Sequence, residues 1–298
     1  MSGVGAIALS LGVLAFALYS RRFESGIVTL PLFFTALGLI IGGDVLGLTD
    51  LDMSAEVLHV LAELTLILVL FNDASRIDLR TLARERGLPI RLLGISMPLT
   101  IILGAAAALL MFGQLSLWEA AVLAAILAPT DAALGQAVVS NERVPLRIRQ
   151  ALNVESGLND GIALPAILIF ISLAAGAHGD GQSAGAWAEF VGLQLVLGPV
   201  VGAAVGLVGG RLLQAATARG WVTGVFQKIS VLALALLCFA AAESLGGNGF
   251  IAAFVGGLAM GNFARDICPR LWEFGEAEGQ VLALLTFAAF GAIMLPIA

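Results

Sequence analysis

APTDAALGQAVVSNERVPLRIRQALNVESGLND, residues 128–160, is the stretch that decides the fold. It places Asp131 in one long apolar segment and Glu155 and Asp160 in the next, with a short basic loop between the two segments. An acidic residue in the middle of a membrane span costs on the order of 2.5 to 3.5 kcal/mol on insertion scales. Nearly all other charged residues lie between apolar segments, so three acids at this depth indicate an ion site.

The composition is that of a membrane protein. Of 298 residues, 59% are hydrophobic and 12% are charged, whereas soluble globular domains carry about 25% charged residues. The apolar runs are long and continuous, unlike the alternating segments of about ten residues in a transmembrane barrel. We therefore predict an all-α polytopic membrane protein that forms a single membrane domain, residues 1–298, and has no nucleic-acid partner.

Segments of about 20 apolar residues predict ten spans. They cover residues 4–20, 27–43, 56–72, 92–112, 118–139, 150–175, 188–210, 229–245, 249–264 and 277–296. All 15 Lys and Arg residues lie in the loops that follow odd-numbered spans. By the positive-inside rule these loops are cytoplasmic and the amino terminus is external. The expected location is the plasma (inner) membrane.

A faint internal repeat relates the two ends of the chain. A shift of 219 residues places Gly38 on Gly257 and Gly42 on Gly261, so spans 1 to 3 resemble spans 8 to 10. Displacement by an odd number of spans inverts the second copy in the membrane. Inverted repeats are typical of secondary transporters, although small residues also recur in membrane helices by chance.

Span 5 contains a predicted helix break. Pro129 removes a backbone donor and disfavours helix at Ala128, and Gly135 loosens the helix further on. Unwound backbone at membrane depth is tolerated where it lines a cavity, and half-helix ends coordinate ions in transporters. We therefore expect Thr130 and Asp131 to belong to an ion site. The alternative is a proline kink whose Asp caps the resumed helix.

Span 6 places its polar side chains on two neighbouring stripes. Glu155 and Asn159 are four residues apart, as are Ser156 and Asp160, and this spacing stacks side chains on one helix face. Carboxylate, hydroxyl and carbonyl oxygens suit hard cations. Two carboxylates that share one site couple their titrations, so a cation and a proton would compete for it. The candidate ligands are Thr130, Asp131, Ser156 and Asp160.

Two motifs carry a resemblance to a known family. PTDA, residues 129–132, and ESGLNDG, residues 155–161, resemble the paired motifs of sodium/proton antiporters of the NhaP-like branch of the cation:proton antiporter superfamily. The resemblance covers the whole chain in the order of its spans. It implies secondary active exchange of a monovalent cation, Na⁺, Li⁺ or K⁺, for a proton, with no cofactor and no enzymatic reaction.

The resemblance also assigns roles within the site. Asp160 would be the principal carboxylate for cation and proton, and it would bind Na⁺ together with Asp131. An Asn-Asp pair stands where electrogenic relatives have Asp-Asp, which implies electroneutral exchange of one cation for one proton. The further ligands would be Thr130 and Ser156, and the residues that organise the site would be Glu155 and Asn159.

The family fold has thirteen helices, of which this chain holds the first ten. Residues 1–90 and 188–298 would be scaffold and dimer-forming spans, which implies a homodimer, and residues 91–175 would form half of the ion-transport bundle. The remaining three helices, and the Arg that pairs with the buried Glu in the family, would lie beyond Ala298. The chain is therefore expected to be truncated at its carboxyl end, unless the second repeat was never completed.

Two other functional classes stay open from the residues alone. A channel or ion-sensing subunit would need a continuous polar path, whereas the acids here are concentrated at one depth. A non-transporting fragment of the same fold is the other alternative. An ATP-driven pump is disfavoured because the chain has no G-x-x-x-x-G-K-[ST] phosphate loop.

Overall fold

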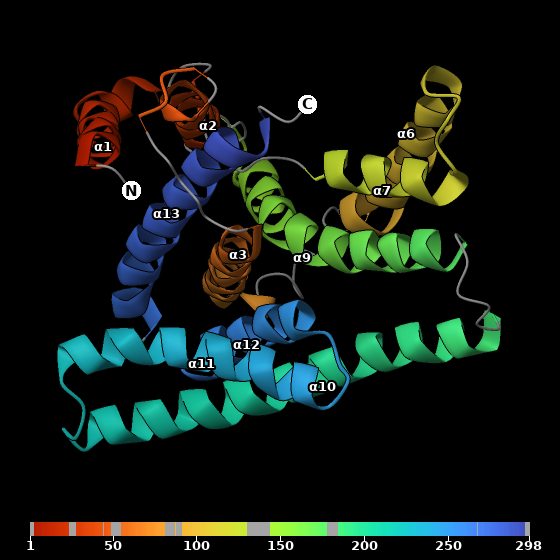
Figure 1. The fold of residues 1–298 in the computed structure, drawn as a ribbon. Helices are drawn as coiled ribbons and strands as arrows, with labels where there is room; N and C mark the ends of the chain where they lie inside the picture. The colour runs from red at the N-terminus through yellow and green to blue at the C-terminus, as the bar shows by residue number, and fades with distance from the viewer. Residues whose placement is uncertain are drawn as a thin grey trace. The chain divides into compact units, whose positions relative to one another are not determined.

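The computed structural model shows an all-helical chain in the residues that it describes. These are residues 3–23, 28–43, 45–48, 55–80, 87, 91–129, 144–177, 184–266 and 268–295. The helices are α1 (Gly3–Phe23), α2 (Leu30–Ile41), α3 (Ala55–Arg76), the π-helix η1 (Leu92–Ser96), α6 (Met97–Met111), α7 (Leu117–Leu127), α9 (Leu146–Ala177), α10 (Ala184–Ala218), α11 (Gly224–Ser244), α12 (Gly249–Phe263) and α13 (Cys268–Ile293) (Figure 1).

The apolar helices correspond to the predicted spans. Within the described ranges, six helical segments are long and apolar enough to cross a membrane, in α1, α3, η1–α6, α10, α11 and α13. Four shorter apolar helices, α2, α7, part of α9 and α12, occupy the remaining predicted positions. The prediction of an all-α protein with several membrane spans is confirmed.

Packing divides the chain into two compact units. The first consists of Met1–Leu66 and Phe274–Ala298, and the second of Ile67–Glu273. Helices α3 and α13 each contribute to both units. The predicted division into scaffold spans and transport bundle follows different boundaries and stays a prediction.

Glycines related by the sequence repeat occupy equivalent helix crossings. In the first unit, a Cβ on Gly38 of α2 would overlap the carbonyl group of Ala288 in α13. In the second unit, a Cβ on Gly257 of α12 would overlap the carbonyl group of Phe71 in α3. The sequence repeat relates α2 to α12 and α3 to α13. The α2–α13 pair and the α12–α3 pair are therefore related by the repeat, and each has a glycine at its crossing.

A row of glycines at four-residue spacing lets α10 lie along α12 in the second unit (Figure 1). A Cβ on Gly202 would overlap the carbonyl oxygen of Ala252, and a Cβ on Gly206 would overlap that of Gly256. Small residues allow membrane helices to approach until their backbones touch, which strengthens dispersion contacts. Helices α10 and α12 therefore pack backbone against backbone over successive turns.

Polar caps fix the turn between α11 and α12. Gly246 adopts φ +78°, a left-handed conformation that suits glycine. The side chain of Asn248 accepts a hydrogen bond of 3.0 Å from the N–H of Ile251, and Glu243 accepts one of 2.8 Å from the N–H of Gly249. Glu243 is therefore an end-of-helix acid that caps the following helix.

A polar cluster ties the end of α3 to the end of α12. The amide of Asn262 donates to the carbonyl of Ile77 at 2.9 Å and accepts from the N–H of Leu79 at 3.0 Å. Arg265 donates to Asp78 in an ion pair, and this hydrogen bond raises the pKa of the guanidinium. These polar groups therefore lie at the ends of two apolar helices.

We predict that Gly202→Ala destabilises the protein, because the new methyl group would push α10 away from the backbone of Ala252. Overpacking of this kind costs about 1 to 3 kcal/mol, so the melting temperature in detergent should fall by several degrees. Gly192→Ala is the matched control in the same helix, because nothing lies within 4 Å of a Cβ at Gly192. Equal melting temperatures for the two variants would contradict the proposed role of the glycine row.

Candidate ion-binding site

Helix α9 carries the second predicted motif without interruption. It runs from Leu146 to Ala177, so Glu155 and Asn159 lie one turn apart on the same face. Asn159 is only 2% exposed, and Glu155 is half-buried. The backbone of Ser156 and Asp160 belongs to the same helix, whereas their side chains lie outside the described part of the structure. The backbone of α9 therefore has the helical conformation that the predicted stacking of these side chains requires.

Helix α7 leads to the first predicted motif. A capping box starts the helix: the Ser116 N–H donates to Glu119 Oε2 at 2.7 Å, and the Glu119 N–H donates to Ser116 Oγ at 3.3 Å. The helix ends at Leu127, and Ala128 and Pro129 form a bend. The helix ends before Pro129, as expected because a proline disfavours the helical conformation of the residue that precedes it.

The predicted cation ligands stay predictions. Thr130 and Asp131, together with Gly135, the second residue of the predicted break, lie outside the described residues. The described part of the chain contains no group of three or more His, Cys, Asp or Glu residues that could hold a metal ion. The structure therefore describes the helix that precedes the first motif and the helix that contains the second. The set of cation ligands is predicted from the sequence alone.

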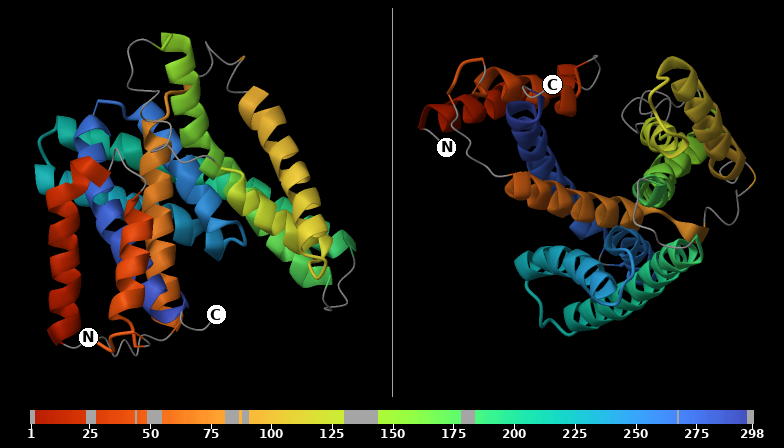
Figure 2. Two further views of the ribbon diagram at one scale, coloured as in Figure 1. Left: turned by 90° about the horizontal axis from the view of Figure 1, so that it is seen from above. Right: turned by 45° about the vertical axis from the view of Figure 1, so that its right-hand side comes forward.

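One apolar core holds these two helices together. Helices α6, α7 and α9 lie side by side (Figure 2). Small side chains of α7, including Ala120 and Ala124, pack with Ala105 of α6 and Ala163 of α9. A Cβ on Gly104 of α6 would lie 3.1 Å from the Cβ of Ala124. At the end of α7, Ala128 packs against the same core. The PTDA motif therefore begins directly after Ala128, which packs in the same apolar core as α9.

An aromatic contact adds to this core near the start of α7. The rings of Trp118 in α7 and Phe170 in α9 stack with their centroids 6.3 Å apart and an interplanar angle of 23°. Aromatic pairs contribute about 0.5 to 1.5 kcal/mol beyond their buried area. Together with the alanines, this pair fixes α7 against α9 over most of the length of α7.

The π-helix η1 before α6 was not expected from the sequence. The N–H of Met97 donates to the carbonyl of Leu92, five residues earlier. Pro98 follows directly; its ring has no N–H and would crowd the carbonyl of Gly94 in a regular α-helix. A wider π turn relieves this crowding, and such turns are frequent at functional sites. Pro98 inside a predicted span was the available signal, and η1 contacts α9.

The fold is that of an all-α membrane protein with several spans, in which α7 precedes the first motif and α9 contains the second. The chain belongs to the family described as "Sodium/hydrogen exchanger, transmembrane", whose family model matches residues 6–297. The resemblance to sodium/proton antiporters inferred from the motifs is thereby confirmed.

Several curated relatives are similar to much of this chain. The low-affinity Na⁺/H⁺ antiporter NhaS1 of Synechocystis is 29% identical over 79% of this chain and 45% of its own length. The Na⁺/H⁺ antiporter ApNhaP of Aphanothece halophytica is 28% identical over 90% of this chain and 50% of its own length. The K⁺/H⁺ antiporter NhaP2 of Shewanella is 27% identical over 87% and 43%, respectively. The chain thus spans about half the length of the curated relatives it matches.

A solved structure shares the fold. The sodium proton antiporter MjNhaP1 of Methanocaldococcus jannaschii superposes with a TM-score of 0.74 at 22% sequence identity. The similarity covers 97% of this chain and 69% of the MjNhaP1 chain. At this level of identity, the likeness establishes the arrangement of the helices.

We predict that Ser116→Ala lowers the stability of the α6–α7–α9 core, because the N–H of Glu119 loses its capping acceptor. Loss of a Ser cap costs about 1 kcal/mol, which should appear as a lower denaturation midpoint. Ser96→Ala is the matched control: Ser96 precedes α6 but makes no capping hydrogen bond with its side chain. A control variant that loses as much stability as Ser116→Ala would contradict this role.

Proposed function

We propose that the protein exchanges a monovalent cation, with Na⁺ as the first candidate, for a proton across the plasma membrane. The observation that carries the proposal is the packing of α7, which leads to the first motif, against α9, which contains the second, in one apolar core. Family membership and the Na⁺/H⁺ antiporters among the relatives support it. Relatives named K⁺/H⁺ antiporters make K⁺ a second candidate cation.

Competition for carboxylate oxygens would couple the two fluxes. Asp160 and Asp131 would bind the cation when both are ionised, with the hydroxyls of Thr130 and Ser156 as neutral ligands. Protonation of Asp160 would remove the negative charge that holds the cation, so a proton entering from one side would release the cation. Exchange then requires that the site opens to each side in turn.

The buried neighbours on α9 would organise the site. Asn159 is buried and uncharged, so it would add hydrogen-bonding capacity without adding a further titrating group beside Glu155 and Asp160. Glu155, one turn earlier, would position the same helix face. With one carboxylate on α9 exchanging one cation for one proton, the transport cycle would be electroneutral.

The proposed orientation follows from the basic residues. Loops with Arg and Lys would face the cytoplasm and the amino terminus would be external, as the positive-inside rule requires. We also propose a homodimer formed by the scaffold spans, which rests on the family resemblance. The exposed apolar side chains along α1, such as Leu11 and Leu18, would face lipid or a second copy.

The decisive experiment follows proton release in vesicles that contain the purified chain and a pH-sensitive dye. Na⁺, Li⁺ or K⁺ pulses against a preset proton gradient should produce a saturable pH change with at least one cation. Asp160→Asn removes the carboxylate for which cation and proton compete, so it should lower the rate at least a hundredfold. Glu56→Gln, in the exposed first turn of α3, is the matched control and should retain wild-type exchange.

The outcomes separate the alternatives. A channel would pass the cation without returning protons against their gradient, and Asp160→Asn would change its selectivity rather than abolish coupled flux. A chain that responds to none of the three cations would refute antiport for this chain and favour the non-transporting alternative.

A second experiment tests the stoichiometry. Asn159→Asp keeps the size of the side chain and places a second exchanging carboxylate beside Asp160, so two protons would move per cation. The Na⁺ gradient reached at equilibrium should then change by about fiftyfold per 100 mV of imposed potential, because one net charge crosses the membrane. In the wild type that gradient should equal the proton gradient at every potential. A voltage-dependent gradient in the wild type would contradict electroneutral exchange.

A further inference from the structure

The turn between α10 and α11 gathers positive charge at the end of two membrane-length helices. Residues 211–230, RLLQAATARGWVTGVFQKIS, contain three basic residues and no acidic one. The apolar segments on either side are Gly192–Ala218 and Gly224–Ser244, so the turn lies at a membrane surface. We call residues 218–228 the α10–α11 turn.

Backbone hydrogen bonds give this turn a fixed shape. The N–H of Gly220 donates to the carbonyl of Thr217, and the N–H of Trp221 donates to that of Ala216, both at 3.0 Å. Gly220 adopts φ +70°, which completes a helix C-cap of the Schellman type. The positions on either side of Gly220 are therefore held in place before any ligand arrives.

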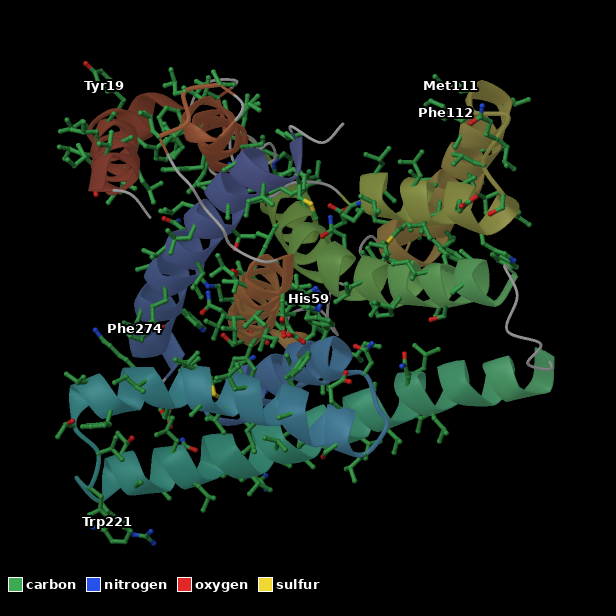
Figure 3. The ribbon with its side chains drawn as sticks, in the orientation of Figure 1. Tyr19, His59, Met111, Phe112, Trp221 and Phe274 are labelled. Atoms are coloured by element: carbon green, nitrogen blue, oxygen red, sulfur yellow. The ribbon has the colours of Figure 1, made fainter. Side chains whose placement is uncertain are left out.

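The fixed turn pre-forms a pair of cation and aromatic ring. The guanidinium of Arg219 lies 5.0 Å from the centroid of the Trp221 ring. Trp221 is 72% exposed and points away from both helices (Figure 3). Such a pair presents a positive charge and an amphipathic ring side by side, and Trp is enriched at the headgroup level of membranes.

The start of α11 adds donors to the same turn. Thr223 precedes α11 without capping it with its side chain, so the positive end of the helix dipole is open to an anion. Lys228 of α11 is half-buried.

We propose that the α10–α11 turn binds the headgroup of an anionic phospholipid. Arg219 and Lys228 would pair with the phosphate near the open end of α11, and the Trp221 ring would lie at the boundary between headgroups and acyl chains. The exposed Val225 and Phe226 would contact the acyl chains. A soluble acidic partner would match the charge but would leave these apolar side chains in water, so the lipid fits better.

This inference does not depend on ion exchange, so binding can test it directly. We would measure the affinity of the purified chain for phosphatidylglycerol and for phosphatidylcholine in detergent by lipid titration. Each basic side chain near an anionic surface contributes about a fivefold factor. Arg219→Gln should therefore weaken phosphatidylglycerol binding about fivefold, and the double variant with Lys228→Gln about thirtyfold, with phosphatidylcholine binding unchanged.

Arg80→Gln is the matched control, because it removes one exposed positive charge from another loop on the same predicted side of the membrane. Equal weakening by Arg80→Gln, or wild-type affinity in the double variant, would overturn the proposal. Inorganic phosphate that binds as tightly as phosphatidylglycerol, and with the same dependence on Arg219, would also overturn it in favour of a free anion. An unchanged melting temperature in phosphatidylcholine shows that the variants are folded.

Discussion

Direct backbone contact between helices is the interaction on which the described structure depends. In a bilayer, lipid tails are as apolar as Leu or Val, so burial of such side chains between helices gains little, and close packing has to supply the attraction. Gly38 and Gly257 each bring a helix against the carbonyl groups of its neighbour, and Gly202 and Gly206 do the same along α10. A methyl group at any of these positions would separate two backbones. The fold therefore depends on the absence of side chains at a few positions.

Several polar groups of the described residues lie at helix ends or are buried with partners. Asn262 satisfies backbone groups at the end of α3, and Glu243 caps α12 across the turn from α11. Thr65 and Thr286 share a hydrogen bond of 2.9 Å inside the first unit. Against this background the polar residues of α9 stand out, because Glu155 and Asn159 lie in the interior of the helix. That location is costly unless the residues serve a function.

The positions of the membrane helices could be read from the sequence, because hydropathy and basic loops report the same physical constraint. The helical stacking of Glu155 and Asn159 was predictable for the same reason: an unbroken apolar segment fixes the 3.6-residue period. The π turn of η1 was not predictable from periodicity, since it depends on how the chain relieves the crowding at Pro98. The division into two units was also inaccessible, because α3 and α13 each pack in both units and no composition change marks Leu66 or Phe274.

The two kinds of helix contact suggest how a site could move within such a fold. The α10–α12 interface is a contact of backbones, in which a shift of one helix along the other would meet carbonyl groups at every turn. The α6–α7–α9 core is a contact of side chains, mostly alanine methyl groups, with Gly104 close to a side-chain Cβ rather than to a carbonyl. Methyl surfaces present fewer steric barriers than interlocked backbones. The contact of interlocked backbones is therefore the one that more strongly resists sliding of one helix along its neighbour.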